Sequence, residues 1–433
     1  MVELDSLAIR PRRVLYAFLL FLAVRFYVQK RRQREQREYF ERFQVGQTFE
    51  TRLVGRVGYF TMDPKNLEAM LQTRFDAWEL GNSRIADGHS WKHSREILRR
   101  QFIRMQYQDM TIFEAPVETM LGRLQDCTGV VDLQPVFFSF TLATTISLIF
   151  GEQSADIKQS DNDIFAAAFD YTSLISAMRM RLAEFCWLYN PPKYRRSCNV
   201  LKEYTSRFVH HALEDKRHPF AVDLLRELKD PKLVRDQLMN VLIAGRDTTA
   251  FLERLREEIA SIAPRRERLT RPQINKMACL RCVLKETNRL YTQVPVNVRL
   301  ACKTTYLPCG GGPDGESPIL IPKNKGVGFS AYHRHRSKEI YGDDANEFRP
   351  ERWEGPQLKN MGFAFMPFHG GPRLCLGKDF ALMEASYGLV RLLQEFPNLR
   401  IAPDVAQTTP GLEKQNLTIV LSSAEGCKLC CAE

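Results

Sequence analysis

The sequence of 433 residues lacks the features that divide a chain into separate units, since it has no Pro/Gly/Ser-rich linker, no low-complexity segment and no internal repeat. A chain of this length has room for two or three average domains, but without a linker we expect one large, mostly helical domain. Its sheets should be small. The sequence predicts strands at Leu53–Phe60, Asn297–Lys303, Ile319–Ile321 and Leu417–Leu421.

The chain also lacks the signs of a disulfide framework and of a zinc site. Its 11 cysteines are odd in number and irregularly spaced, and a chain of this size needs no disulfides to hold its core. Two C-x-x-C pairs, Cys279 with Cys282 and Cys427 with Cys430, have no second ligand pair. We therefore expect reduced thiols that face the cytosol. The first pair should lie on a helix, as residues of the protein core or of a pocket lining.

Signs of nucleic-acid binding and of a phosphate loop are absent as well. The formal net charge of +11 would suit a nucleic acid, but no basic-aromatic interleaving and no base-reading motif accompanies it, so we expect no nucleic-acid partner. The run Gly310–Gly312 has no Gly-Lys-Ser/Thr ending and no helix behind it. A turn that joins two short strands is the expected structure there.

An apolar run, Val14–Val24, lies near the N-terminus and is interrupted by Arg25. It is shorter than the roughly 20 residues of a bilayer span, but flanking arginines can snorkel and extend its reach. No small-x-small cleavage site follows, so we expect residues 1–30 to form an uncleaved membrane anchor and residues 31–433 a single domain. The basic cluster Lys30–Arg42 favours a cytosolic position of that domain; the alternative is a helix that lies in the interface.

The most informative segment is a glycine-rich loop that fits the pattern F-x-x-G-x-R-x-C-x-G. The fixed positions are Phe368, Gly371, Arg373, Cys375 and Gly377. Glycine allows positive φ and a close approach of backbone to a flat ligand. A helix-like segment begins directly after the cysteine, and free N–H groups at a helix start favour a thiolate. Such an environment suits a heme iron held by one cysteine sulfur; the alternative is a buried structural cysteine beside a tight turn.

The loop resembles the heme-binding loop of the cytochrome P-450 superfamily, and three further segments resemble motifs of that family. Glu286 and Arg289, in the predicted helix Ile274–Tyr291, resemble its E-x-x-R pair, and Phe348–Trp353 resembles its P-E-R-[FW] segment. The resemblance implies one buried charge network of Glu286, Arg289 and Arg352. Taken alone, two residues at i, i+3 would also suit an ordinary surface ion pair.

A second resembling segment contains Trp91 and Arg95, which are four residues apart and so share a helix face. The family places this pair against a heme propionate. The resemblance implies that Arg299 and Arg373 join them, and the planar, always charged guanidinium suits a carboxylate.

The third segment, Val241–Thr249, resembles the A-G-x-[DE]-T-T stretch of the long helix over the heme. Glycine in an apolar helix is unfavourable by about 1 kcal/mol unless the space is needed, and the resemblance implies that Ala244 and Gly245 leave room for O₂. Asp247 and Thr248 would then relay protons. From the residues alone, this segment could also be the C-terminal end of a helix that has the G-x-D-T-T sequence by chance.

The resemblance implies the cytochrome P-450 fold, mainly α with small β-sheets, from Phe43 to the C-terminus. After Thr249 the sequence passes almost directly to Leu255–Ile259, an L-R-x-E-I segment that the family places after further helix. The second half of the long helix and the helix after it are therefore expected to be missing near residues 250–251. The missing part of the helix would cross about 30 Å, which needs around 20 helical residues. This gap leaves an inactive or folding-defective heme-binding pseudoenzyme as an alternative.

Other stretches, among them Val130–Phe138 and Leu307–Pro318, narrow the resemblance to fungal n-alkane and fatty-acid hydroxylases. The resemblance implies heme b ligated by Cys375, hydroxylation of a lipid-like substrate at or near its terminal carbon, and electrons from NADPH–cytochrome P-450 reductase at the endoplasmic reticulum membrane. Apolar residues implied to line the pocket are Val294, Val296 and Val298.

Basic residues near the predicted cysteine side of the heme are Lys92, Arg99, Arg100 and Lys378. They would either steer an acidic electron donor or form a solvated face. A heme-thiolate enzyme that does not use oxygen is a further alternative, against which Asp247 and Thr248 argue.

Overall fold

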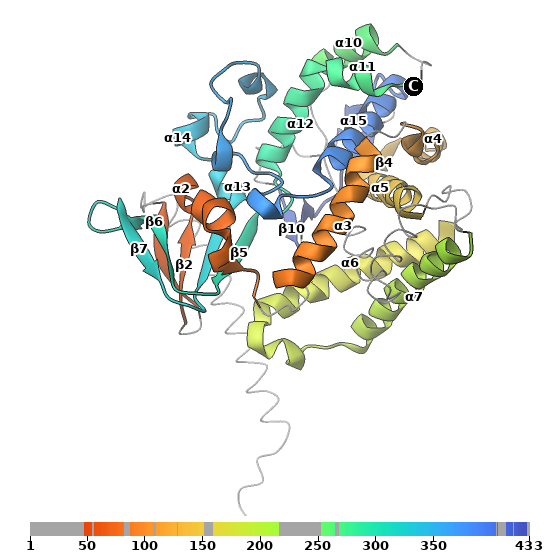
Figure 1. Ribbon diagram of the computed structural model, residues 1–433. Helices are drawn as coiled ribbons and strands as arrows, with labels where there is room; N and C mark the ends of the chain where they lie inside the picture. The colour runs from red at the N-terminus through yellow and green to blue at the C-terminus, as the bar shows by residue number, and fades with distance from the viewer. Residues whose placement is uncertain are drawn as a thin grey trace, which may run out of the picture.

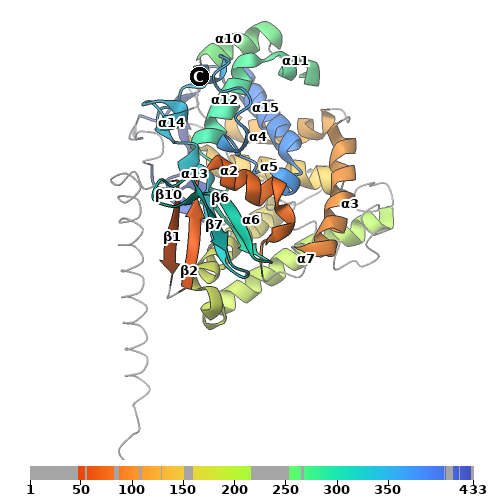
Figure 2. The same ribbon diagram turned by 60° about the vertical axis from the view of Figure 1, so that its left-hand side comes forward.

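A computed structural model of the chain describes residues 47–53, 56–81, 87–106, 110–127, 129–150, 159–215, 253–264, 268–403, 405, 413–418 and 420–430. In this part of the chain the longer helices gather on one side and the larger sheets lie on the other (Figure 1). Turning the molecule brings the sheets forward and leaves the helices behind them (Figure 2). The fold is mainly α with small β-sheets, as the sequence predicts.

The described helices range from one turn to seven. They are α2 (Pro64–Glu68), α3 (Gly88–Gln106), α4 (Thr111–Gln125), α5 (Leu133–Phe150), α6 (Gln159–Leu182), α7 (Pro192–Asp215), α10 (Glu253–Ile262), α11 (Arg271–Lys276), α12 (Ala278–Leu290), α13 (Ala331–Arg334), α14 (Lys338–Tyr341) and α15 (Lys378–Glu395). Short helical turns are η1 (Ala69–Thr73), η2 (Phe75–Ala77), η4 (Ala183–Leu188), η5 (Pro350–Trp353), η6 (Gly362–Ala364) and η7 (Gly371–Arg373).

The strands form small sheets. They are β1 (Thr48–Leu53), β2 (Arg56–Thr61), β3 (Trp78–Glu79), β4 (Val130–Asp132), β5 (Val296–Ala301), β6 (Thr305–Gly311), β7 (Ser317–Ile321), β8 (Gly326–Ser330), β9 (Arg400–Ile401), β10 (Gln415–Leu417), β11 (Leu421–Ser423) and β12 (Lys428–Cys430). The largest sheet has the order β1-β2-β8-β5-β3, with β2 and β8 parallel. The pairs β6-β7 and β10-β11 are antiparallel hairpins, and β4-β12-β9 is a third small sheet.

Two of the strand predictions are wrong in detail. The predicted strand Leu53–Phe60 covers the end of β1 and most of β2, which pair antiparallel. The predicted strand Leu417–Leu421 is a chain reversal, because Leu417 pairs with Leu421 and the Thr418 N–H donates to the Val420 carbonyl. Both predictions were based on short runs of apolar and β-branched residues, which favour a strand. Such a run does not show whether the chain bends within it.

The predicted helix Ile274–Tyr291 is broken at Met277, which has extended backbone between α11 and α12. The Glu258 carboxylate accepts the N–H groups of Cys279 and Leu280, at 2.8 and 2.9 Å. A side chain from α10 thus satisfies donors that a new helix start leaves open. The break follows from this tertiary cap, which local sequence does not reveal.

Two apolar clusters hold the described elements together. One lies among α4, α10, α12 and α15, where residues four apart, such as Leu255 with Ile259 and Leu280 with Leu284, turn one face inward. The other lies between the largest sheet, α2 and η1 and contains Leu71 and Phe329. The loop that precedes α15 packs on η1 through η7, so this loop joins the two clusters.

Several predictions fall outside the described residues. They concern the apolar run Val14–Val24, the segment Val241–Thr249 and the gap near residues 250–251. Among the described helices, none has the length and apolar character needed to cross a membrane. The ten cysteines of this part of the chain are free thiols, and Cys282 is buried on α12 as expected.

Candidate functional site

The loop before α15 is shaped by one residue that must be glycine. Gly371 has φ +64, and a Cβ there would lie 1.8 Å from the Leu71 carbonyl oxygen. An L side chain would therefore meet both a strained backbone and a rigid neighbour. The Cys375 N–H donates to the Phe368 carbonyl oxygen at 3.1 Å and closes the loop.

Cys375 lies just before the first turn of α15, as the sequence predicts. Burial raises the pKa of its thiol, while backbone N–H groups of Gly377 and Lys378 and the charge of Arg95 act in the opposite direction. The expected helix-start donors thus reach the sulfur, but burial outweighs them. A cation at the sulfur would reverse this balance, because metal coordination deprotonates a thiol.

Three guanidinium groups gather around this loop. Arg95, on α3, donates to the Leu374 carbonyl oxygen. Arg373 stacks over the Trp91 ring at 4.1 Å and forms an ion pair with Asp87. The Arg95 guanidinium lies 5.7 Å from the centre of the same Trp91 ring. The structure thus brings together Trp91, Arg95 and Arg373, which the sequence assigned to one site.

Arg299 completes the group from β5. Its side chain is 3% exposed, and its Nη1 donates to the Asn297 side chain at 3.0 Å and to the Val298 carbonyl at 2.8 Å. Burial, and then the charge of Arg373, lowers the pKa of Arg299 to about 10. Its Nε is buried and has no hydrogen-bond partner in the described part of the chain.

The guanidinium cluster of Arg95, Arg299 and Arg373 carries three positive charges. Among the described residues, Asp87 is hydrogen-bonded to it and Glu79 acts on Arg373 through its charge. The described carboxylates therefore do not neutralise the cluster, which stays positively charged. Arg95 and Arg299 each have a pKa lowered by burial and by the charge of Arg373. A ligand with two carboxylates would relieve this repulsion.

A second group of residues beneath the loop is built around one buried carboxylate. Glu286 accepts two bonds from Arg289, at 2.9 and 2.8 Å, and one from Arg352 Nε at 2.9 Å. The Trp353 indole N–H and the Arg349 backbone N–H also donate to it, each at 2.9 Å. Burial works against the charged form, but these donors outweigh it and hold the pKa of Glu286 below its usual value.

The two arginines of this network extend to the chain between α13 and η5. Arg289 donates to the carbonyls of His335, Ala345 and Glu347. Arg352 donates to the Tyr341 carbonyl at 3.0 Å and to Asp344 at 3.3 Å. The structure therefore brings Glu286, Arg289 and Arg352 into one buried network, in place of an ordinary surface ion pair.

His335 lies in the core between this network and the loop. Its Nδ1 is 2.7 Å from the Thr292 hydroxyl and its Nε2 accepts the Met366 N–H at 2.9 Å. Burial lowers the pKa of His335 to about 3, so the ring is neutral. Since Met366 precedes Phe368 by two residues, His335 fixes the start of the loop.

Several residues at the site were not predicted from the sequence. Asp87 stands one residue before α3, and Asn297 and His369 meet across β5 and the loop, with 3.4 Å between the Asn297 amide nitrogen and His369 Nε2. Burial lowers the pKa of His369 to about 4, and its Nδ1 has no partner among the described residues. The one feature of the sequence that could have indicated Asp87 is its position next to the segment with Trp91.

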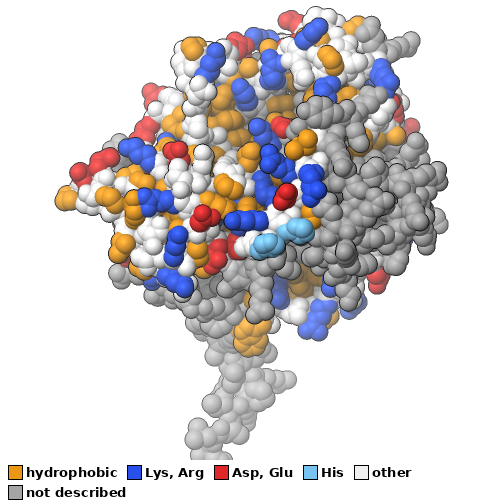
Figure 3. All heavy atoms as spheres, viewed as in Figure 1, with side chains coloured by type: hydrophobic (Ala, Val, Ile, Leu, Met, Phe, Trp, Pro, Cys, Tyr) orange, Lys and Arg blue, Asp and Glu red, His pale blue; other side chains and the backbone are white. Residues whose placement is uncertain are grey.

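Basic side chains also gather on the surface over α3. Lys92, Arg99 and Arg100 are exposed on this helix, close to the loop. Figure 3 shows Lys and Arg side chains grouped near the histidines on this face. The exposed side of α3 therefore carries several basic side chains, on the helix whose Arg95 contacts the loop of Cys375. Four predicted site residues, Ala244, Gly245, Asp247 and Thr248, lie outside the described residues.

Comparison with known proteins gives one consistent family. A family model described as "Cytochrome P450" matches residues 50–425. The chain is 39% identical to a protein described as "Cytochrome P450" from Arthroderma benhamiae, over 94% of this chain and 88% of that protein. It is 36% identical to "Cytochrome P450 52A5" from Candida maltosa, over 83% and 78% of the two chains. It is also 36% identical to "Cytochrome P450 52A1" from Candida tropicalis, over 85% and 77%.

Proposed function

The chain belongs to the cytochrome P-450 family, and from this premise we propose that it hydroxylates long-chain n-alkanes or fatty acids at or near the terminal carbon. Members of the family are monooxygenases whose cofactor is heme b, held through a cysteine thiolate. The observation that supports the proposal is the guanidinium cluster beside Cys375, which stays positively charged although Asp87 and Glu79 lie near it.

The residues present fit heme b. The group carries two carboxylates and one iron, which match the charge excess of the guanidinium cluster and the single thiol at the end of the loop. The buried Nε of Arg299, which has no hydrogen-bond partner among the described residues, would donate to one of the carboxylates. Cys375 would hold the iron, and Arg95, Arg299, Arg373 and Trp91 would hold the carboxylates. Once bound, heme supplies the reduction of O₂ and the insertion of one oxygen atom into a C–H bond.

The protein's own residues tune the sulfur and support the loop. The N–H groups of Gly377 and Lys378 stabilise negative charge on the Cys375 sulfur, which favours electron donation to a bound iron. The network of Glu286, Arg289 and Arg352 ties α12 to the chain before the loop. We assign this network a supporting role, because it fixes the approach to Phe368.

Proton delivery is assigned to Asp247 and Thr248, with Ala244 and Gly245 leaving space for O₂. The support for these roles is the resemblance of Val241–Thr249 to the family motif. A threonine hydroxyl can bond back to a helix carbonyl and locally open the helix, and an acidic neighbour can then pass protons inward.

The substrate proposal has support from β5. Val296 and Val298 are 49% and 50% exposed, on the opposite face of the strand from the buried Arg299. Exposed β-branched residues beside a heme site suit an aliphatic chain. Together with Val294, they are the residues we propose to line the substrate pocket.

The proposed electron donor is an NADPH–cytochrome P-450 reductase. The basic side of α3, with Lys92, Arg99 and Arg100, would steer an acidic donor toward the loop of Cys375. We place the protein at the endoplasmic reticulum membrane with its domain, residues 31–433, in the cytosol. The support is the apolar run within residues 1–30 and the basic cluster that follows it.

Product analysis tests the proposed function. Membranes with the chain and a matched reductase are supplied with NADPH and either hexadecane or palmitic acid, and products are separated by gas chromatography with mass spectrometry. The account expects terminal or near-terminal alcohols that disappear when NADPH is omitted or Asp247 is changed to Ala. Absence of these alcohols in the complete mixture, or alcohols that form equally well without NADPH, would contradict the proposal.

A second candidate is an inactive heme-binding pseudoenzyme. It is favoured by one observation, the short passage from Thr249 to the L-R-x-E-I segment at Leu255–Ile259. Reading the transcript across the codons for residues 249–251 separates a gene-model error from a true deletion. Heme incorporation without any NADPH-dependent product from the 433-residue chain would favour this candidate.

A further inference from the structure

Two histidines form a pair on the exposed face of α3. His89 and His93 are both exposed, and their ring centres lie 6.3 Å apart with 15° between the ring planes. Residues four apart share a helix face, whereas Trp91 stands about 200° around the helix from His89. The pair therefore lies on the opposite side of α3 from Trp91, which contacts Arg373. Figure 3 shows histidine side chains at this surface.

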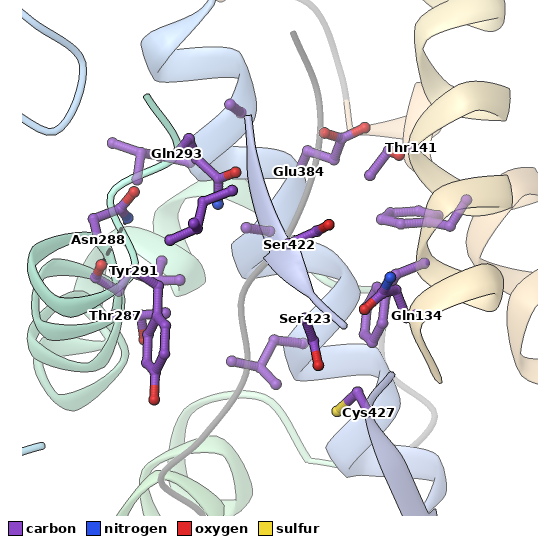
Figure 4. A pocket seen from close by; sticks show the side chains of 18 of the residues that line it. Gln134, Thr141, Thr287, Asn288, Tyr291, Gln293, Glu384, Ser422, Ser423 and Cys427 are labelled. Carbon is purple, nitrogen blue, oxygen red and sulfur yellow. Dashed lines mark hydrogen bonds between the residues drawn. The ribbon is translucent and has the colours of Figure 1, made fainter. Parts of the chain in front are cut away.

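The pair is separate from the cavity that adjoins the loop of Cys375. This cavity lies between α5, α12, α15 and the hairpin β10-β11, and Phe368 of the loop lines it. Figure 4 shows Glu384, from α15, at its wall; burial raises the pKa of this carboxyl group to about 8. Neither histidine of the pair lines the cavity, so the pair is not part of the heme site.

The ring nitrogens of the pair are available to a ligand. The buried His335, by contrast, uses both of its ring nitrogens inside the protein, on Thr292 and Met366. In the described part of the chain, neither His89 nor His93 has a hydrogen-bond partner, and the ring contact of each is with the other. A free imidazole nitrogen is a good ligand for Zn²⁺, Cu²⁺ and Ni²⁺.

The spacing of the pair suits a chelate, in which both rings bind one ion. Two histidines at i, i+4 on one helix face hold a metal ion in the H-E-x-x-H motif. With metal–nitrogen bonds of about 2.0–2.1 Å, the ring centres of such a chelate lie about 5 Å apart. The observed separation is 6.3 Å. Exposed side chains change rotamer freely, so rotation of the two side chains brings both nitrogens onto one ion.

The surroundings of the pair select the class of ion. Lys92 and Glu96 are exposed on the same stretch of α3 and offset each other's charge, and the N-terminal end of a helix disfavours a cation. Mg²⁺ and Ca²⁺ need oxygen ligands and are therefore not expected here. No group of three or more His, Cys, Asp or Glu side chains among the described residues is placed to hold an ion, so water completes the coordination of an ion on this pair.

We propose that His89 and His93 form a surface site for a divalent transition-metal ion that prefers imidazole, namely Ni²⁺, Cu²⁺ or Zn²⁺. The ligands are one nitrogen from each ring, together with water. The bound ion links successive turns at the start of α3, the helix from which Arg95 reaches the loop before α15. The inference does not depend on the proposed function.

The test is calorimetric titration of the full 433-residue chain, made without a histidine tag, with nickel chloride. Nickel is the probe because the 11 cysteines of the chain would compete for zinc and for reduced copper. We expect binding of one Ni²⁺ to the pair, and weaker binding at lower pH because protons compete for the ring nitrogens. Magnesium chloride, titrated in the same way, should not bind to the pair.

His93→Ala should weaken this nickel binding at least tenfold, because the second nitrogen of a chelate acts at a high effective concentration. The matched control is the exchange variant with His93→Arg and Arg99→His, which keeps the composition and the charge of the exposed face. It separates the two histidines by about 15 Å along the helix and should lose the site to the same extent.

His89→Ala removes the other ligand and should also weaken nickel binding at least tenfold; it decides the matter if one of the other variants does not fold. Circular dichroism checks the helix content of each variant. Absence of nickel binding by the unchanged chain would overturn the proposal, and so would nickel binding of equal strength in the exchange variant.

Discussion

Arg299 is a buried cation whose surroundings indicate the kind of ligand that would pair with it. It is almost fully buried near the Arg373 guanidinium, and its pKa is lowered by burial and then by the charge of Arg373. A buried charge is unfavourable unless it is paired and hydrogen-bonded. The carboxylates of heme b supply that pairing, so Arg299 should matter most when heme is bound.

Replacing Arg299 with Met should speed the loss of heme. One charge-assisted hydrogen bond contributes about 1.5–3 kcal/mol, which corresponds to roughly tenfold to more than a hundredfold in the rate of heme transfer to apomyoglobin. The control is Lys92→Met, which removes an exposed charge on α3. Equal transfer rates for the two variants would contradict the assignment of Arg299.

Glu384 should make the folded chain less stable as the pH rises. Its folded pKa of about 8 exceeds its unfolded value of about 4.3, so the folded state binds more protons between these values and loses stability as pH rises through them. His335 and His369 act in the opposite sense below about pH 6.5, because burial lowers their pKa.

Between about pH 6.5 and 8 the free energy of unfolding should therefore fall by up to about 1.4 kcal/mol per pH unit. Urea unfolding at several pH values measures this slope, and Glu384→Gln should remove it. An identical slope in the two chains would show that Glu384 is ionised in the folded state.

At the scale of elements, the loop before α15 depends on its contact with η1. Gly371→Ala would place a Cβ 1.8 Å from the Leu71 carbonyl oxygen, with φ at +64. Gly362 has φ +53 but nothing within 4 Å of its Cβ position, so Gly362→Ala is a matched control that carries the backbone strain alone. We expect Gly371→Ala to lose heme binding and Gly362→Ala to keep it, as measured by heme content after purification. Equal heme content would mean that the loop does not need this contact.

The charge network between α12 and η5 gives a second prediction at this scale. Glu286→Gln removes the carboxylate that pairs with Arg289 and Arg352. Breaking a buried pair in this way costs about 3–5 kcal/mol, which denaturant unfolding can measure. The exposed pair of Arg254 and Glu354 is the control, and Glu354→Gln should leave stability unchanged. A similar, small effect of both changes would contradict the buried role of Glu286.

The elements also show where sequence reasoning works and where it stops. Residue spacing and resemblance together placed Trp91 with Arg95, and Glu286 with Arg289, because helix geometry brings such pairs onto one face. The break at Met277 and the chain reversal within Leu417–Leu421 could not be predicted, since each depends on a tertiary contact or a bend without a local signal. Asp87 stands close to Trp91 in the sequence, but its pairing with Arg373 was missed because Arg373 is far away along the chain.

At the scale of the whole molecule, the loop with Cys375 joins the helical cluster to the sheet cluster. The guanidinium cluster contains residues of α3, β5 and the loop, so it forms only when these three elements are in place. The central claim, that this chain assembles a heme-thiolate centre, is therefore a claim about the fold of the complete chain. The short sequence between Thr249 and Leu255–Ile259, where we predict that helix is missing, bears most on this claim.

The most direct measurement is the reduced carbon-monoxide difference spectrum of the 433-residue chain in membranes, beside a Cys375→Ala control. The account predicts a Soret band at the wavelength for which the family is named, absent from the control. No such band with the protein present, or the same band in both samples, would contradict thiolate ligation by Cys375.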